Sequence, residues 1–195
     1  MKTTVALIVL CALSVAACSE SPSGPTSGTR VEAVIQDSPA QAATVTGTVA
    51  GNISASLWNG DRWVDVGSPN GITFPLQIAG RTTTIHGEAS VVSGSYSRVR
   101  LVFQGVAARV AMGSVVGGIT VTSDRTIILG GSDERVEIDV PVSTFAVEAD
   151  ASVRRVVVFE VRSQQWLTVS AVQSGSVEDA ALRAAVTAST RLENR

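Results

Sequence analysis

Arg135-Val-Glu-Ile-Asp-Val140 alternates charged and aliphatic side chains without interruption. A period of two places the valines and the isoleucine on one face of a β-strand and the charged residues on the other. Segments 98–103 and 157–162 repeat the pattern, with charged residues at several of the intervening positions. Strands with one apolar and one wet face predict a protein in which sheets pack against each other.

Shorter candidate strands fill most of the chain around these three segments. Glycine, asparagine, serine and proline bound them, and few of the gaps could hold a long helix. The candidates are residues 31–36, 44–49, 53–58, 62–66, 72–78, 81–86, 119–122, 126–129 and 167–172. Many short strands at this spacing predict an all-β fold, a sandwich or a barrel, and we expect an antiparallel β-sandwich.

One short α-helix is expected near the end of the chain. Ser176 is a good capping residue, and two acids follow in the first turn, where they favour the positive end of the helix dipole. Leu182 and Val186, four positions apart, form a narrow apolar face. We therefore expect a β-sandwich domain over residues 30–175, followed by a C-terminal helix and tail over residues 176–195.

The first residues have the pattern of an export signal. Lys2 gives one positive charge, and an apolar run of about thirteen residues ends at Ala17. The run is too short to cross a bilayer as a helix. Val15-Ala-Ala-Cys18 resembles the lipobox of bacterial lipoproteins, which implies that residues 1–17 are removed and that Cys18 becomes the lipidated first residue. The alternative is an ordinary secretory signal that leaves a free cysteine.

The lipobox resemblance also predicts a location. Several acyl chains on one residue anchor a protein stably, so the chain is expected at the cell envelope, with its lipid anchor in a membrane. Ser19, rather than aspartate, follows the cysteine, which favours the outer membrane under enterobacteria-like sorting. Residues 18–29 are rich in serine, proline, glycine and threonine, a composition typical of a flexible tether.

Composition argues against several classes of function. After the leader, fourteen arginines stand against seventeen acids, a net charge of about −3 that gives no electrostatic basis for binding nucleic acid. His86 is the single histidine of the sequence, and no cysteine follows Cys18. One histidine cannot supply a usual zinc ligand set, and no nucleophile elbow accompanies it. We therefore predict no catalytic residue, no metal site and no cofactor.

Several segments occur in an order that is found in a known family. Residues 31–40 are similar to a strand that ends in a Leu-Thr-Asp-Ala-Pro turn, and Trp63-Val-Asp-Val66 is similar to a Trp-Val-x-Leu strand. Ser93–Leu101 resembles a Gly-x-Tyr-x-x-Ile-Arg-Leu segment, in which Tyr96 is expected to pack and to hydrogen-bond a neighbouring loop. Residues 30–172 thus resemble an uncharacterised family of bacterial and archaeal lipoprotein domains with a transthyretin-like (prealbumin-like) β-sandwich. The resemblance implies fold and location, and it implies no activity.

Residues 53–66 contain the strongest local signal for a binding surface. Asn59-Gly60 is typical of a two-residue hairpin turn, which would place Trp58 opposite Asp61. The aliphatic residues then share the core face, and two serines share the wet face with Trp58, Asp61, Trp63 and Asp65. Two diagonal tryptophans among carboxylates and hydroxyls suit a sugar or a protein hot spot. The plainer interpretation is that both rings pack under another segment.

Three hypotheses of function remain open. The preferred one is a non-catalytic, lipid-anchored module that binds a polysaccharide or an envelope protein through its two tryptophans. A rival is an envelope hydrolase that uses a carboxylate pair such as Asp37 and Asp139, which would have to converge in a pocket. The third is a structural subunit of an envelope assembly, which would expose an apolar patch.

Overall fold

The computed structural model describes residues 30–37, 45–66, 70–77, 81–130, 135–148 and 153–194. The predicted signal peptide, the lipidation at Cys18 and the tether lie outside the described residues, as does the turn at residues 38–40. No helix in the described part of the chain is long and apolar enough to cross a membrane.

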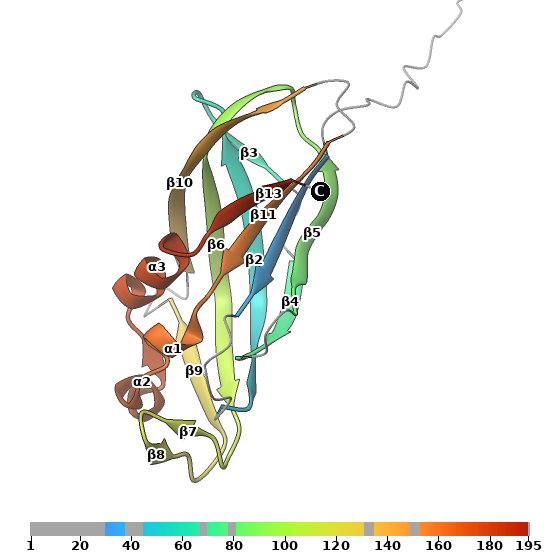
Figure 1. Ribbon diagram of the computed structural model, residues 1–195. Coiled ribbons are helices and arrows are strands. Elements are labelled where there is room, and N and C mark those ends of the chain that lie inside the picture. The colour runs from blue at the N-terminus through green and yellow to red at the C-terminus, as the bar shows by residue number, and fades with distance from the viewer. Residues whose placement is uncertain are drawn as a thin grey trace, which may run out of the picture.

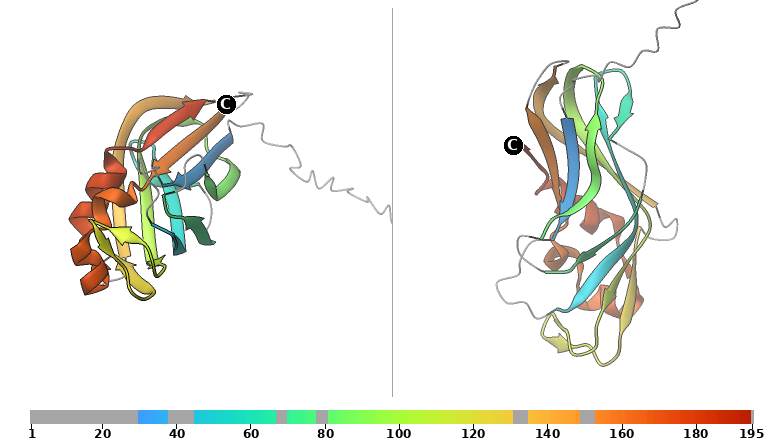
Figure 2. Two further views of the ribbon diagram at one scale, coloured as in Figure 1. Left: turned by 60° about the horizontal axis from the view of Figure 1, so that its bottom comes forward. Right: turned by 90° about the vertical axis from the view of Figure 1, so that its right-hand side faces the viewer.

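Two layers of strands face each other in the described residues (Figure 1; Figure 2, right). The first sheet has the order β13-β11-β1-β5, and its strands are β1 (Arg30–Gln36), β5 (Thr83–Ser90), β11 (Arg154–Glu160) and β13 (Arg191–Asn194). The second has seven strands, β2 (Gly47–Trp58), β3 (Trp63–Asp65), β4 (Asn70–Pro75), β6 (Gly94–Val110), β9 (Arg125–Leu129), β10 (Arg135–Val147) and β12 (Ser176–Val177). β7 (Val115–Val116) and β8 (Ile119–Thr120) form a separate small hairpin.

Three short helices follow β11 and cover one side of the sandwich (Figure 1). They are α1 (Ser163–Trp166), α2 (Val169–Ser174) and α3 (Asp179–Thr187). The pairing is mostly antiparallel, while β1 pairs with β11 and β12 pairs with β9 in parallel. The structure is therefore a mostly β protein with antiparallel-rich sheets, as the alternation predicts.

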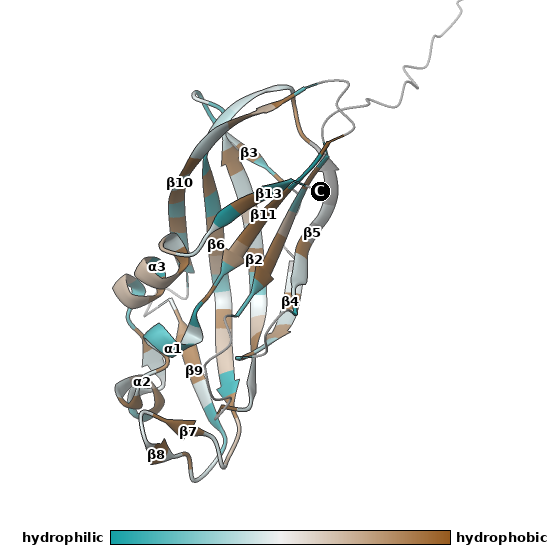
Figure 3. Ribbon diagram, in the orientation of Figure 1, coloured by the Kyte–Doolittle hydropathy of each residue, from teal (hydrophilic) through white to brown (hydrophobic). Residues whose placement is uncertain are grey.

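The core lies between the two layers. Charged and aliphatic residues alternate along parts of β6 and β10 (Figure 3). The two kinds of side chain therefore take opposite faces of the sheet. The largest fully buried side chains are Trp166, Tyr96, Phe74, Phe103 and Phe159. The expected packing and hydrogen bond of Tyr96 are confirmed. Its ring stacks on Phe145, and its hydroxyl donates to the Val92 carbonyl at 2.7 Å. Burial raises the pKa of this phenol.

β2 corrects the prediction of separate strands at 44–49 and 53–58. It runs without a break from Gly47 to Trp58, so it includes residues 47–49 of the first segment and all of the second. Its pairing with β6 shifts register between Ala50 and Asn52. Gly51 lies at this bulge, where an added Cβ would come within 2.6 Å of the Val106 Cα. Because glycine permits so close an approach of the backbones, the strand continues where its sequence is rich in small residues.

The predicted strand at residues 167–172 is wrong, since α2 occupies most of it. The Thr168 hydroxyl accepts a hydrogen bond from the Ala171 N–H at 3.2 Å, and Gly175 ends the helix in the left-handed conformation. These two caps outweigh the β-branched residues between them.

The C-terminal helix is confirmed as α3, although its cap is Glu178 and not Ser176, which lies in β12. Beyond α3, the chain returns to the first sheet as β13, a four-residue strand that pairs with β11. Residues 176–194 are thus integrated with both sheets.

Candidate functional site

The hairpin that carries the two tryptophans has a longer loop than predicted. Trp58 pairs with Trp63, so the loop contains four residues, Asn59–Arg62, in place of two. The Asn59 side-chain oxygen accepts hydrogen bonds from the N–H groups of Asp61 and Arg62 at 3.0 and 2.9 Å, which holds the longer loop. Because the register moves by two residues, every strand side chain keeps its predicted face.

Trp58 and Trp63 are therefore direct cross-strand partners and not diagonal neighbours. Their ring centroids are 5.3 Å apart with an interplanar angle of 55°, and both side chains are half-buried. Asp65 is exposed one row further, opposite Ser56. Asp61 lies exposed in the loop and not opposite Trp58, which corrects its predicted position.

The neighbouring strands add charged residues that the hairpin alone does not reveal. β6 lies beside β2, with Arg98 opposite Trp58 and Arg100 opposite Ser56, and β10 lies beside β6, with Asp139 opposite Arg100. The Arg100 guanidinium carbon lies 4.1 Å from the centroid of the Trp63 ring, a cation–π contact. We call this outer surface of β3, β2, β6 and β10 the tryptophan face.

Arg100 is the electrostatic centre of the tryptophan face. Its Nε and Nη2 donate to the two carboxylate oxygens of Asp139 at 2.6 and 2.9 Å, and its Nη1 lies 3.2 Å from Glu137 Oε2. The Arg100 hydrogen bond holds the pKa of Asp139 below its usual value, and the same bond raises the pKa of Arg100. The bidentate pair fixes both side chains in one geometry.

A wide, shallow hollow of about 520 Å³ opens on this face. It is lined by Arg100, Arg135, Glu137, Asp139 and Arg183. Arg183 reaches it from α3 and donates to the backbone carbonyl of Glu137, while Arg135 bonds the Glu137 carboxylate. The hollow thus presents several donors and acceptors, and Arg100 links it to the Trp63 ring.

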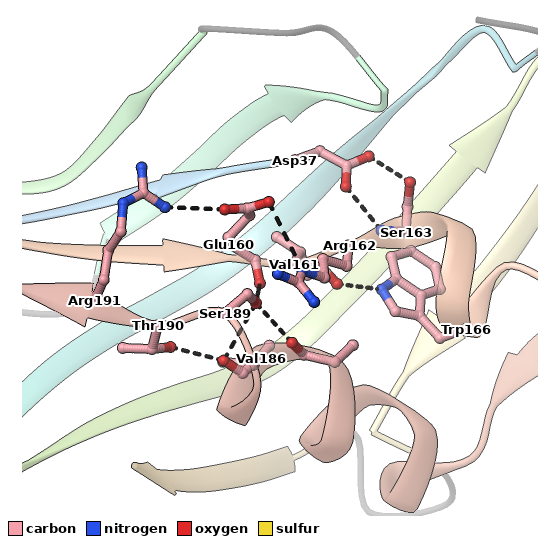
Figure 4. A network of polar contacts seen from close by, with 11 residues as sticks. Asp37, Glu160, Val161, Arg162, Ser163, Trp166, Val186, Ser189, Thr190 and Arg191 are labelled. Atoms are coloured by element: carbon pink, nitrogen blue, oxygen red, sulfur yellow. Dashed lines mark hydrogen bonds and ion pairs between the residues drawn. The ribbon is translucent and has the colours of Figure 1, made fainter. Parts of the chain in front are cut away.

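The two acids that the rival hydrolase hypothesis requires, Asp37 and Asp139, do not converge. Asp37 is 1% exposed at the end of β1, where Oδ2 accepts from the Gln77 N–H at 2.6 Å. Oδ1 accepts from the Ser163 N–H at 2.7 Å (Figure 4). The Ser163 hydroxyl also donates to Asp37. Asp139 lies on the outer face of the other sheet, so no described pocket contains both acids.

The surroundings of Asp37 form a structural junction. Trp166 packs beside it with its Nε1–H donated to the Val161 carbonyl at 2.9 Å, and the Ser189 hydroxyl donates to the Glu160 carbonyl at 2.6 Å (Figure 4). These contacts join β1 and β11 to α1 and to the end of α3. Asp37 therefore belongs to the fold and has no free oxygen facing a cleft.

No group of three or more histidine, cysteine or acidic side chains in the described segments is placed to hold a metal ion. His86 lies on β5, opposite Ala33 of β1. No protein-family model, no curated protein and no solved structure matches the chain. The geometry of the tryptophan face is therefore the feature that can indicate a function.

Proposed function

We propose that the chain is a non-catalytic lipoprotein of the cell envelope whose β-sandwich binds a polysaccharide through the tryptophan face. The export signal, the lipobox-like Val15–Cys18 and the polar segment 18–29 support anchoring by lipid, with the outer membrane as the expected location. The binding role has separate support in the geometry of the two rings and of their charged neighbours.

The single observation that carries the binding proposal is the arrangement around Arg100. Its guanidinium lies over Trp63 and at the same time makes a bidentate pair with Asp139 at the edge of the open hollow. Half-buried aromatic rings supply flat apolar contact for a sugar ring. The prearranged charged groups supply hydrogen bonds for its hydroxyls, and a ligand then orders few protein side chains on binding.

The composition of the tryptophan face favours a polysaccharide over a protein. The centres of protein–protein interfaces are depleted of charged residues and more apolar than their rims. Here the rows next to the tryptophans carry Arg98, Arg100, Asp65, Asp139 and Glu137. A charged centre with many hydrogen-bonding groups suits a ligand that consists largely of hydroxyl groups.

We also propose the transthyretin-like arrangement for the sandwich. It is supported by two four-stranded layers, β13-β11-β1-β5 and β3-β2-β6-β10, in which the first strand runs parallel to β11 near the end of the chain. The hairpin β7–β8, the strand β9 and the three helices are then additions to that framework.

Tryptophan fluorescence tests the binding proposal. We expect a saturable change when residues 19–195 are titrated with soluble envelope or plant polysaccharides, because Trp166 is 1% exposed and the other two rings lie at the site. Trp63→Ala and Arg100→Gln should each weaken binding at least tenfold. Arg191→Gln removes a cation from the opposite sheet and should leave affinity unchanged. Absence of a change with every glycan, neutral and acidic, would overturn sugar binding and favour a protein partner.

Mass spectrometry of the protein from bacterial membranes tests the anchor. We expect residues 1–17 to be absent and the first residue, Cys18, to carry a diacylglyceryl group. Cys18→Ser should release the protein from the membrane fraction. An unmodified cysteine at the new amino end would support the ordinary secretory signal and contradict the lipoprotein proposal.

A further inference from the structure

The β7–β8 hairpin and α2 lie at the end of the sandwich that is far from the start of β1 (Figure 1; Figure 2). A second cavity is lined by residues of both. Its volume is about 210 Å³. Among the described residues that line it, five are aliphatic, Val116, Ile119, Val121, Val169 and Val172, and the others are Thr120, Thr122, Arg125 and Gln173. Neither the tryptophan face nor the Asp37 junction includes any of these residues.

The hairpin is fixed in position, so the cavity exists without a ligand. The Ser114 hydroxyl bonds both the N–H and the carbonyl of Thr46, at 3.1 and 3.2 Å. Val121 donates its N–H to the Ser114 carbonyl at 2.8 Å, which closes the base of the hairpin. At the tip, an added Cβ on Gly117 would come within 2.8 Å of Val169 Cγ2, so the turn rests directly on α2.

One cation faces this apolar cavity. Arg125, at the start of β9, is the charged residue among the described residues that line it. No ion pair or hydrogen bond is found for its guanidinium in the described part of the chain, and its neighbour Asp124 accepts a bond from the Met112 N–H at 2.9 Å. Ile119 is 52% exposed, so an apolar side chain faces solvent at the same cavity that Arg125 lines.

We propose that this cavity binds a medium-length fatty acid, with the acyl chain between the hairpin and α2 and the carboxylate on Arg125. The volume lies below the roughly 300 Å³ at which pockets take drug-sized molecules, so the occupant is a single chain. A water-sized group occupies roughly 30 Å³ in a liquid, so the cavity has room for about seven carbons of an acyl chain. The planar guanidinium pairs with a carboxylate through two parallel hydrogen bonds.

The volume of the cavity and the charge of Arg125 select different properties of the ligand. Apolar burial alone would accept an alcohol as well as an acid, whereas pairing with Arg125 requires the carboxylate. The cavity also limits the length of chain that can be buried. Octanoate should therefore bind better than octanol and better than butanoate, and hexadecanoate should gain little over octanoate.

Isothermal titration calorimetry of residues 19–195 tests the proposal, with octanoate, octanol, butanoate and hexadecanoate as ligands. Arg125→Gln should weaken octanoate at least tenfold and remove its advantage over octanol. Arg109→Gln is the matched control, because Arg109 pairs opposite Thr126 on the next strand and does not line this cavity. Val172→Trp, which fills the cavity, should abolish binding while the thermal midpoint shows that the protein remains folded.

Two results would overturn the proposal. One is absence of heat with octanoate at millimolar concentration in the unmodified chain. The other is equal affinity for octanoate and octanol, which would mean that Arg125 plays no part. In both cases polysaccharide binding at the tryptophan face is unaffected, because the two sites share no residue.

Discussion

The Asp37 junction and the tryptophan face each depend on a carboxylate, and the two carboxylates have different partners. Asp37 is buried and accepts hydrogen bonds from the backbone N–H groups of Gln77 and Ser163. The Asp139 side chain is 41% exposed and pairs with the guanidinium of Arg100. Backbone partners in a buried site make the first acid part of the fold. The second orients a side chain that still faces solvent, as a binding surface requires.

The largest expected effect is at Asp37. Asp37→Ala leaves two buried N–H groups without acceptors and should lower the free energy of unfolding by about 3–5 kcal/mol, because each hydrogen bond to a charged group contributes about 1.5–3 kcal/mol. Chemical denaturation of residues 19–195 measures the loss. Asp37→Asn should also destabilise strongly, because its amide N–H₂ faces donors.

Ser163→Ala is the matched control for Asp37. It removes the hydroxyl donor and leaves both backbone bonds in place, so a loss of about 1 kcal/mol is expected. If Asp37→Ala and Ser163→Ala lower the free energy of unfolding by the same amount, the backbone N–H groups do not depend on Asp37. Asp37 would then not differ from Asp139 in its importance for the fold.

Arg100 is expected to have a smaller effect on stability. Arg100→Met keeps the apolar stem over Trp63 and removes the ion pair and the cation–π contact, which should cost about 1 kcal/mol in total. The fluorescence of Trp63 in the Arg100→Met variant should also differ from that of the unmodified chain. Arg98→Met, on the same strand and exposed, is the control and should change stability by less than 0.5 kcal/mol on the scale of surface substitutions. A loss above about 3 kcal/mol at Arg100 would instead make this residue part of the fold, as Asp37 is.

The two regions also differ in how far the sequence predicts them. Alternation along β6 and β10 predicts which arginines and acids face solvent, and the Trp58–Trp63 hairpin keeps its predicted faces. Strand alternation is a local property, set by the period of side chains along one strand. The predicted loop length was wrong because the Asn59 side chain accepts hydrogen bonds from two N–H groups and so stabilises a longer loop. The Asn-Gly preference for a two-residue turn does not take these bonds into account.

The long-range neighbours could not be predicted. Arg100 meets Trp63 because β6 lies beside β2, and it meets Asp139 because β10 lies on the other side of β6. Nothing in the spacing of these residues along the chain encodes that order of strands. Asp37 is a further example, since its partners Gln77 and Ser163 are 40 and 126 residues away. From the sequence alone, the carboxylate of Asp37 could serve in catalysis. In the folded protein its hydrogen bonds give it a structural role.

The smallest change in stability is expected from the pH dependence of the Arg100–Asp139 ion pair. Since Arg100 depresses the pKa of folded Asp139, the pair stabilises the protein above the unfolded pKa of aspartate, near 4, and this contribution is lost as pH falls through the lower folded pKa. The exposed side chain limits the contribution to under about 1 kcal/mol. Urea unfolding of the unmodified chain and of Asp139→Asn should differ by a constant amount from about pH 5 to 7. The difference should begin to shrink near pH 4 and should vanish only once the pH is below the lowered pKa of folded Asp139. In the Arg100→Gln background, Asp139→Asn should have no such pH-dependent effect. A difference that persists unchanged to pH 2 would mean that Asp139 acts by packing and not by charge, and the tryptophan face would then lack the ion pair on which its preorganisation depends.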